Sequence, residues 1–365
     1  MIVALPSAPE PVAPKPPGVP VRNLWHMLLY AWNLASVSYP WLAGVEDAPT
    51  LDVLFADILV KGVRRQLRRG LGRAYKTQAQ TLRGIRGRID FTGSLKRLTF
   101  ANGQAHCHFQ EFSVNVPRNQ IIRSTLAMLA RDGAFGIPQT GTEDLRHNMR
   151  RLVRDLDGID LVQDPLELIG RQHLGRNDTE YRIMLNVCEM AWRHRMPTES
   201  SGAKSMSALD RALMTLHDVY ERFVSNFYRL RLQGWNIGSQ VHMSWNAEQS
   251  SPLLPGLQPD LRFRHHETGR LVILDTKFTP NIVITSRSGK DVFNSSHLYQ
   301  IYAYLRSQEH LSDIHRSATG ILLYPTADLE LDDTVILQGH PIRIVTINLA
   351  QPWPDIEEGL LGLFP

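Results

Sequence analysis

The stretch Arg270–Phe278, RLVILDTKF, contains four consecutive apolar residues followed by an acid, a threonine and a lysine. An uninterrupted apolar run of this kind is typical of a central strand that is covered on both faces. In an extended strand Asp275 and Lys277 lie on one face, about 7 Å apart along the strand, and Thr276 lies on the other. A charged pair at the end of a buried strand conflicts with its surroundings, and such conflicts are typical of functional sites.

A second strand is expected at Leu257–His265, with Pro259-Asp260 near its beginning. The turn sequence His266-Glu267-Thr268-Gly269 joins it to the apolar strand, which predicts a hairpin that brings Asp260 alongside Asp275. Two facing carboxylates repel each other and raise the pKa of at least one of them, and a bound cation removes that conflict. The alternative is a surface hairpin with an exposed ion pair worth less than ~1 kcal/mol.

Hydrolysis of a phosphodiester needs a group that activates water and neutralises the charge of the transition state, and a metal ion does both. Magnesium favours oxygen ligands, usually one or two carboxylates with several waters. The hairpin therefore indicates a metal-dependent nuclease site in the carboxyl-terminal half of the chain.

Two helices flank this hairpin in the sequence. The stretch 216–227 places Glu221 in an otherwise apolar and aromatic helix, and 296–305 places Gln300 and Tyr304 four residues apart, on one helix face. Each of these residues alone is compatible with an ordinary polar position on a helix. In this order along the chain, the helices and the hairpin form a specific pattern.

The remaining sequence predicts an α/β (α+β overall) chain. Before the hairpin we expect helices and strands, and after it a further helix and two strands. The expected helices are 23–34, 51–69, 119–131, 143–155, 178–194, 209–232 and 296–307. Strands and turns are expected over 77–91, and the other expected strands are 104–116, 236–245, 257–265, 270–278, 320–324 and 342–347.

Residues 1–20 contain seven prolines and few large apolar side chains. We therefore expect a disordered Pro-rich tail at 1–21, because such a segment buries too little surface to offset its ordering entropy. Asp164-Pro165 marks a break, and we place a first domain at 22–172 and a second at 173–365. No run approaches the ~20 apolar residues of a membrane span, and no signal peptide is evident, so a cytoplasmic protein without a membrane partner is expected.

The net charge is +4, and it is unevenly distributed. From Lys61 to Arg97 there are twelve lysines and arginines against one acid, Asp90. Such a block attracts phosphate or an acidic partner surface, although a solvated basic helix and loop would have the same composition. Cys107 and Cys188, the two cysteines of the chain, provide neither a disulfide framework nor a zinc knuckle.

Taken together, the site residues resemble the PD-(D/E)xK nuclease superfamily, including the Gln-x-x-x-Tyr helix of its RecB-like branch. Further segments resemble the McrC family, the nuclease subunit of McrBC-type modification-dependent restriction systems. These segments are RNLWHMLLYAW at 22–32, RGRIDF at 86–91, YERFVSNF at 220–227, PDLRF at 259–263, ILDTKF at 273–278 and HLYQIYAYL at 297–305.

The resemblance implies a restriction-endonuclease-like mixed sheet flanked by helices, preceded by a mixed α/β domain that docks on a McrB-like AAA+ GTPase hexamer and stimulates it. It also implies Mg²⁺-dependent cleavage of double-stranded DNA in phage defence, with Mn²⁺ as a substitute for Mg²⁺. Asp260 and Asp275, helped by Glu221, would bind the metal, Lys277 would orient or deprotonate the attacking water, and Gln300 and Tyr304 would position the DNA strand or the water. Arg83, Arg86, Arg88 and Arg97 are candidates for binding DNA or the partner.

Two other functions are compatible with the same residues. One is an adaptor that regulates an AAA+ NTPase without cleaving DNA, which the large first half and its basic block favour. The other is a stand-alone RecB-like repair nuclease, which would cut DNA without any partner.

Overall fold

The computed structural model describes residues 18–133, 142–193, 208–279, 281–286, 289–326 and 329–364. The chain forms two compact units, one made of Tyr39–Met206 and the other of Met1–Ser38 together with Ser207–Pro365. Of the Pro-rich tail expected at 1–21, all but the last four residues lie outside the described residues, and Val21 begins the first helix.

The unit that contains Ser207–Pro365 is built around a mixed sheet, which confirms the expected fold class. Its described strands lie in the order β10-β11-β9-β6-β5-β4; β9 is parallel to both of its neighbours, and the other pairs are antiparallel. These strands are β4 (Trp235–Ser239), β5 (Leu261–His265), β6 (Leu271–Thr276), β9 (Thr319–Thr326), β10 (Asp332–Leu337) and β11 (His340–Asn348), and a separate hairpin is formed by β7 (Val283–Thr285) and β8 (Asp291–Phe293).

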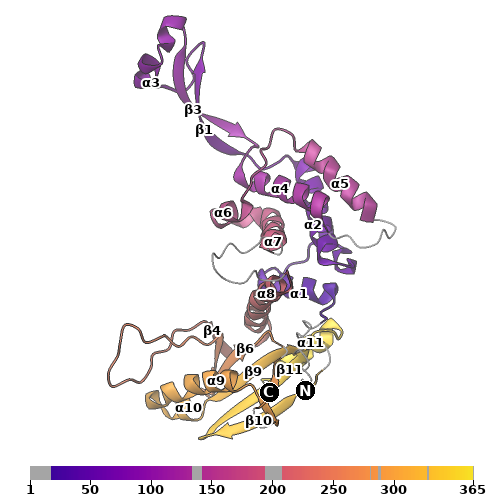
Figure 1. Cartoon of the computed structure of the whole chain (residues 1–365), viewed down its shortest axis with the longest axis vertical. Helices are drawn as coiled ribbons and strands as arrows, with labels where there is room; N and C mark the ends of the chain where they lie inside the picture. The colour runs from indigo at the N-terminus through magenta and orange to yellow at the C-terminus, as the bar shows by residue number, and fades with distance from the viewer. Residues whose placement is uncertain are drawn as a thin grey trace, which may run out of the picture. The chain divides into compact units, whose positions relative to one another are not determined.

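Strand β6 lies between β5 and β9, and all of its residues are buried, as its apolar run predicts. Helix α9 (Ser295–Gln308) covers one face of the sheet, where Ile301 and Leu305 share a buried cluster with Ile273 (Figure 1). A Cβ added at Gly320 of β9 would lie 3.1 Å from side-chain atoms of Ile301 and Leu305. The helix therefore packs directly on the strand at this glycine, which fixes its distance from the sheet.

Aromatic side chains fill the space between the other face of the sheet and three helices. The rings of Tyr228 and Phe263 lie 5.2 Å apart, and those of Tyr30 and Phe227 lie 5.4 Å apart. The helices are α1 (Val21–Ala31), α8 (Ala208–Arg231) and α11 (Trp353–Leu361).

Helix α1 belongs to this sheet-containing unit and not to the first domain expected at 22–172. Buried Asn23 donates from Nδ2 to the carbonyl oxygens of Leu349 and Gln351, both at 2.8 Å, and Asn226 Nδ2 donates to Tyr30 O at 3.0 Å. The boundary therefore differs from the expected one, because the apolar face of this helix is buried against elements more than 190 residues away in the chain.

The other unit consists of helices and one small sheet. Its helices are α2 (Leu51–Arg69), α3 (Phe91–Lys96), α4 (Pro117–Asp132), α5 (Thr142–Asp155), α6 (Pro165–Gly170) and α7 (Thr179–Arg193), and its strands are β1 (Ala74–Leu82), β2 (Arg88–Ile89) and β3 (Ala105–Ser113). Short helical turns are η1 (Pro40–Leu42), η2 (Val45–Asp47), η3 (Thr99–Asn102) and η4 (Arg176–Asp178), and the sheet-containing unit has η5 (Glu309–Leu311) and α10 (Asp313–Arg316). Among the described residues, no helix has both the length and the apolar character needed to cross a bilayer.

Helix α7 packs with α2 and α4, so this unit extends beyond the expected boundary at residue 172. Tyr181 OH donates to Asn119 Oδ1 and accepts from Gly72 N, both at 2.9 Å, and Glu180 Oε1 lies 2.6 Å from Arg65 Nε. These contacts reach 62 to 115 residues back along the chain, a distance at which sequence periodicity carries no information.

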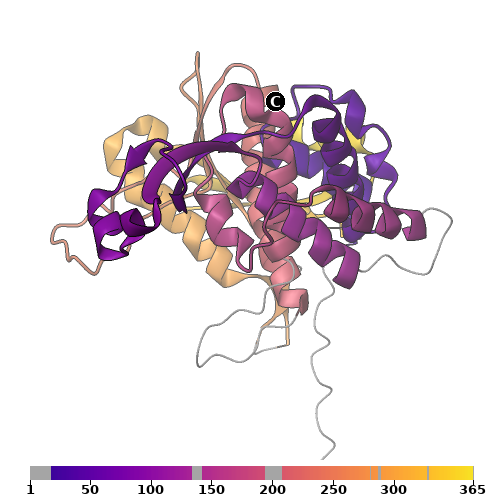
Figure 2. The same ribbon diagram turned by 90° about the horizontal axis from the view of Figure 1, so that it is seen from above.

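Residues 74–113 form what we call the arm. Its strands pair antiparallel in the order β1-β3-β2 and run as a narrow ribbon away from α2, α4 and α5, with α3 at the far end (Figure 1 and Figure 2). Most residues of β1 are exposed.

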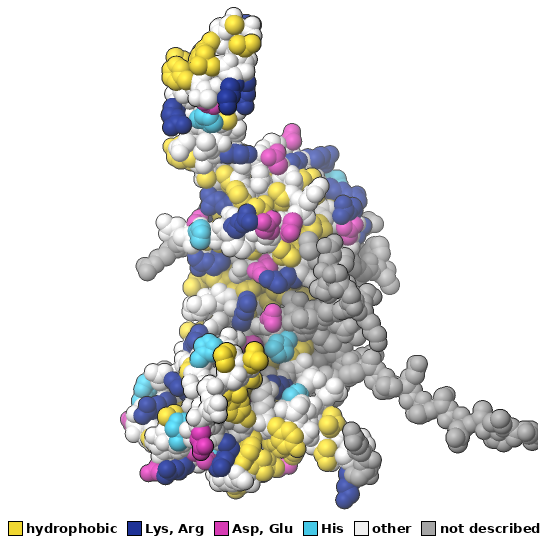
Figure 3. Space-filling view, turned by 60° about the vertical axis from the view of Figure 1, so that its left-hand side comes forward, with side chains coloured by type: hydrophobic (Ala, Val, Ile, Leu, Met, Phe, Trp, Pro, Cys, Tyr) yellow, Lys and Arg dark blue, Asp and Glu magenta, His cyan; other side chains and the backbone are white. Residues whose placement is uncertain are grey.

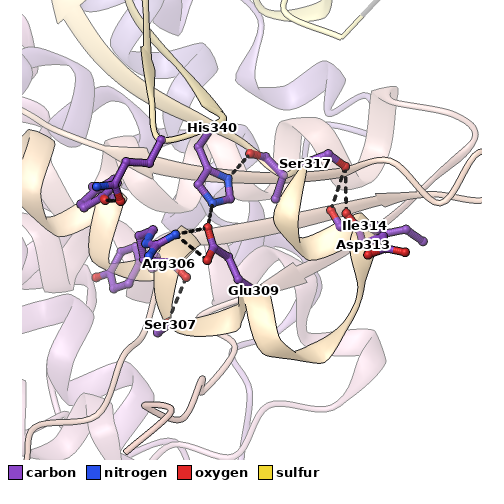
Figure 4. Close-up of polar contacts among 11 residues, drawn as sticks. Arg306, Ser307, Glu309, Asp313, Ile314, Ser317 and His340 are labelled. Carbon is purple, nitrogen blue, oxygen red and sulfur yellow. Dashed lines mark hydrogen bonds and ion pairs between the residues drawn. The ribbon is translucent and has the colours of Figure 1, made fainter.

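A buried histidine connects the end of α9 to the sheet (Figure 4). The side chain of His340, at the beginning of β11, is fully buried; Nε2 lies 2.8 Å from Glu309 Oε1 and Nδ1 lies 2.9 Å from Ala318 O. Both ring nitrogens of the histidine therefore have an oxygen partner, one on η5 and one in the chain just before β9. Burial would raise the pKa of Glu309, but hydrogen bonds from Arg306 and His340 hold it below its usual value.

Glu309→Gln should lower the free energy of unfolding at neutral pH by about 1–3 kcal/mol, because a buried charge-assisted hydrogen bond is weakened. A carboxylate with a lowered folded-state pKa stabilises the fold above its unfolded pKa and loses that contribution as the pH falls through the folded one. Denaturant titrations should therefore show wild-type stability declining below pH 4.5, the usual pKa of the side chain, and a weaker decline in the variant. Asp313→Asn, which changes a carboxylate that is 92% exposed, is the control and should alter stability little.

Candidate active site

The sequence-predicted hairpin brings the two aspartates together. The pairing of Leu261 with Leu274 in the antiparallel β5–β6 ladder places Asp260 and Asp275, the next residues outward, opposite each other. Asp260 Oδ2 accepts hydrogen bonds from Thr276, at 2.7 Å from its backbone N and 2.6 Å from its Oγ1. Thr276, to which the sequence assigned no role, therefore fixes the orientation of the Asp260 carboxylate.

Asp275 is only 2% exposed, although it is a carboxylate. Its Oδ2 lies 2.5 Å from Lys277 Nζ, but no donor among the described residues reaches that oxygen with hydrogen-bond geometry. Burial and the charge of Asp260 raise the pKa of Asp275, Lys277 opposes both effects, and the net value is about 6. The ionised form of Asp275 is therefore destabilised by its burial and by the nearby negative charge of Asp260.

Lys277 is held by a chain of polar groups on α9. Its Nζ donates to Gln300 Oε1 at 2.8 Å, Gln300 Nε2 donates to Tyr304 OH at 2.7 Å, and Tyr304 OH donates to Gln258 O at 3.3 Å. Tyr304 is buried in the apolar cluster below α9, so the last group in this series of hydrogen bonds is fixed in place. The helical spacing expected for Gln300 and Tyr304 puts Gln300 in contact with the lysine and Tyr304 in contact with Gln300.

Glu221 projects from α8 toward the same end of the sheet. Its Oε1 accepts from Gln240 Nε2 at 2.6 Å, and burial and the charge of Asp260 raise its pKa. Gln240 N also donates to Asp260 O at 2.9 Å, and Gln240 has a φ of 46°, a left-handed conformation uncommon outside glycine. Strained backbone of this kind persists where the surroundings enforce it, and here Gln240 contacts Glu221 through its side chain and Asp260 through its backbone.

Sequence reasoning missed Gln240, because nothing in its neighbourhood marks a left-handed residue. It also missed two groups near the lysine. His297 Nδ1 lies 2.9 Å from Tyr324 OH; burial and the charge of Lys277 lower the pKa of His297, and burial and the charge of Asp275 raise that of Tyr324. His297 begins the segment HLYQIYAYL at 297–305, and its place in that segment is the one sequence feature that could have marked it as a site residue.

A pocket of about 440 Å³ opens beside Glu221. Arg222 and Arg229 of α8 line it together with Ser239 and Gln240. Cationic side chains beside a group of carboxylates suit a substrate that carries negative charge along its length.

The carboxylates fit a divalent cation. Glu221 and Asp260 raise the pKa of Asp275 by their charge, and the unbonded Asp275 Oδ2 is a buried acceptor without a matching donor. Hard oxygen donors of this kind suit Mg²⁺ or a similar ion. Among the described residues, however, Glu221, Asp260 and Asp275 do not bring one oxygen each within 4.8 Å of the others.

The four arginines singled out in the sequence all lie on or beside the strands and α3 of the arm, in the other compact unit. The guanidinium of Arg86 lies over the ring of Phe109, 4.1 Å from its centroid, and Arg83, Arg88 and Arg97 are exposed.

The chain is similar to proteins of McrBC restriction systems. Residues 12–325 match the family model described as the McrBC 5-methylcytosine restriction system component. The chain is 29% identical over 353 residues to the type IV methyl-directed restriction enzyme EcoKMcrBC of Escherichia coli (strain K12), covering 95% of this chain and 98% of the relative. A solved assembly of Thermococcus gammatolerans McrB AAA+ hexamers with bound McrC contains a chain of the same fold, with a TM-score of 0.53, 16% identity, and coverage of 94% of this chain and 76% of that one.

Asp275→Asn should stabilise the protein in EDTA at pH values above 6. A carboxyl whose pKa is raised from 3.8 to about 6 costs stability once it is ionised, so stability falls as the pH rises through this window. Thermal unfolding should show a gain of up to about 2–3 kcal/mol, at ~1.4 kcal/mol for each pKa unit. Added Mg²⁺ should stabilise the wild type more than the variant. Asp218→Asn, at a carboxylate that is 67% exposed, is the control; an equal gain there would contradict the explanation.

Proposed function

The chain belongs to the McrBC family of 5-methylcytosine restriction-system components, and from this we propose that it is a McrC-like endonuclease subunit that hydrolyses double-stranded DNA. The observation that carries the proposal is the buried Asp275 facing Asp260, with Lys277 beside it. A surface hairpin with an ordinary ion pair would not bury a carboxylate to 2% exposure and leave one of its oxygens without a donor.

Asp260 and Asp275 would hold Mg²⁺, or Mn²⁺ in its place. When bound, the ion supplies a water of lowered pKa and neutralises charge on the phosphate. Thr276 keeps Asp260 oriented through two hydrogen bonds, so the carboxylate needs no rearrangement to serve as a ligand. Glu221 would act through a water, because the three carboxylates do not converge within 4.8 Å.

Lys277 would orient the attacking water and offset charge that develops on the phosphate. An ammonium group has three N–H donors. In this site Gln300 accepts from one of them and the Asp275 carboxylate lies beside the ammonium, so a donor remains for a water or a phosphate oxygen. Gln300 and Tyr304 act as positioning residues, since they fix the lysine and themselves remain tied to the backbone of Gln258.

The pocket beside Glu221 would hold the DNA backbone. Arg222 and Arg229 lie seven residues apart on α8, about two helical turns, and so lie along one side of the pocket. Two cations spaced in this way suit successive phosphates of one strand.

We further propose that the unit Tyr39–Met206, which includes most of the domain expected at 22–172, docks on a McrB-like AAA+ GTPase hexamer and stimulates its hydrolysis. The support is the arm, which carries exposed arginines and exposed apolar side chains. A simple nuclease needs no such element, whereas cleavage under the control of a motor requires a surface that binds the motor.

Lys277→Ala should reduce Mg²⁺-dependent DNA cleavage by the reconstituted complex by about 10²-fold or more, because charge stabilisation in the transition state is lost. Partner binding, measured by size-exclusion chromatography, should remain, since the change removes one charge and no core volume. Lys290→Ala, at an exposed lysine of the β7–β8 hairpin, is the matched control and should cleave normally. Unimpaired cleavage by Lys277→Ala or Asp275→Ala would contradict the proposed nuclease site. Robust DNA cleavage by the purified chain without a partner would instead favour a stand-alone nuclease.

The double charge reversal Arg83→Glu and Arg97→Glu should lower stimulation of the partner GTPase at least about tenfold, because like charges disfavour the docked state. The measurement is GTP turnover by the partner at increasing concentrations of each variant. Arg150→Glu with Arg154→Glu, at exposed positions on α5 of the same unit, is the charge-matched control. Equal loss in both pairs would mean that net charge, and not the arm, drives association.

A further inference from the structure

The two faces of the small sheet in the arm differ in chemistry. Strand β3 alternates, so Ala105, Cys107 and Phe109 form a buried apolar cluster on one face. His106 and His108 lie on the opposite face, where their rings meet edge to face with centroids 5.6 Å apart. The apolar cluster does not extend to that second face.

Asp90 joins the two histidines. One ligand atom of each of the three residues lies within 4.8 Å of the others, a grouping found nowhere else in the described parts of the chain. The Asp90 carboxylate and His108 Nε2 are 3.7 Å apart. Four-coordinate Zn²⁺ with bonds of ~2.0–2.1 Å separates its ligand atoms by about 3.4 Å, so modest side-chain rotations would complete the geometry.

The backbone and neighbouring residues hold these side chains in place. Asp90 Oδ1 accepts from Gly93 N at 2.8 Å, which leaves Oδ2 directed at His108. His106 Nδ1 lies 3.1 Å from Thr81 Oγ1, which leaves Nε2 available, and metal-ligating histidines usually engage their second nitrogen in this way. The hydrogen bond from Gly93 N holds the pKa of Asp90 below its usual value.

Gly93 is required for this arrangement. A Cβ added there would lie 2.2 Å from Asp90 Oδ2, closer than any real contact. Any other residue at this position would push aside the oxygen that faces the histidines.

Helix α3, which begins after Asp90, is held to β3 by polar contacts. Ser94 Oγ accepts from His106 N at 2.8 Å, and Asp90 N donates to His106 O at 2.8 Å. The large apolar side chains Phe91 and Leu95 are each 64% exposed, and apolar atoms gather at this end of the arm (Figure 3). Burial of apolar surface therefore contributes little to holding α3, and small units with so little core commonly rely on a metal or a disulfide.

We propose that Asp90, His106 and His108 form a structural Zn²⁺ site that fastens α3 to β3, with a water in the fourth position. Two imidazole nitrogens and one carboxylate oxygen suit Zn²⁺ and other late first-row ions, whereas Mg²⁺ favours oxygen alone. Arg88, the partner of His108 in the β2–β3 register, carries a positive charge that opposes the ion. Because its side chain is exposed, solvent screens that charge.

The test is Zn²⁺ binding by the full chain after EDTA treatment, measured by isothermal titration and by metal analysis after dialysis. The measurement is made in the Asp275→Asn background, so that the candidate active site contributes least. We expect one equivalent of Zn²⁺ and, with Co²⁺ as a probe, the visible absorption of a tetrahedral site. His106→Ala and His108→Ala should each weaken binding at least about tenfold, and His173→Ala, at an exposed histidine of the same unit, should not.

Gly93→Ala gives a sharper test, because it leaves all three ligands in place. Alanine ordinarily favours a helix over glycine, but here its Cβ would displace Asp90 Oδ2, the oxygen that faces the histidines. The proposal expects weaker Zn²⁺ binding and loss of Zn²⁺-dependent protection from hydrogen exchange in residues 90–108. Equal Zn²⁺ binding by the parent and the His106→Ala/His108→Ala double variant would overturn the proposal. Neither readout depends on DNA cleavage, so failure here leaves the nuclease proposal intact.

Discussion

The electrostatic conflict at the end of β6 governs the arrangement of the sheet-containing unit. Asp275 follows four apolar residues into the middle of the sheet, where burial and the charge of Asp260 raise its pKa to about 6. Three groups make this charge tolerable: Lys277, which directly follows the strand, Thr276, which holds Asp260, and α9, which holds the lysine. The sheet positions the two aspartates, and helix α9 positions the lysine that opposes their charge.

The same conflict explains why this part of the site could be predicted from sequence. An apolar run that ends in Asp-x-Lys violates the local rule for a buried strand, and the violation is visible without any structure. The hairpin follows from turn composition, and the antiparallel register then fixes the facing of Asp260 and Asp275. Gln300 and Tyr304 follow from helical spacing alone. All of these inferences depend on residues within a few positions of one another, or on a single short turn.

The features that could not be predicted depend on contacts distant in sequence. The sequence shows that α1 is apolar, but not that Asn23 bonds to carbonyl oxygens 326 and 328 residues away and so joins the helix to the last part of the chain. For the same reason the unit boundary near residue 206 could not be predicted from the periodicity of the sequence. Gln240 escaped because its left-handed φ arises from its bonds to Glu221 and to the Asp260 backbone, and not from any preference of glutamine.

The two units also differ in how they hold polar groups, and this difference bears on their roles. In the sheet-containing unit, the buried charge of Asp275 lies in a sheet that is packed by aromatic and aliphatic side chains on both faces, which restricts the positions of the carboxylates and the lysine. In the arm, the apolar cluster comprises three buried residues, and large side chains such as Leu98, 72% exposed, point to solvent. Chemistry needs a rigid site, whereas docking needs exposed surface that is stabilised when a partner covers it. An arm with so small a core therefore depends on polar links such as those around Asp90 to keep its shape before a partner binds.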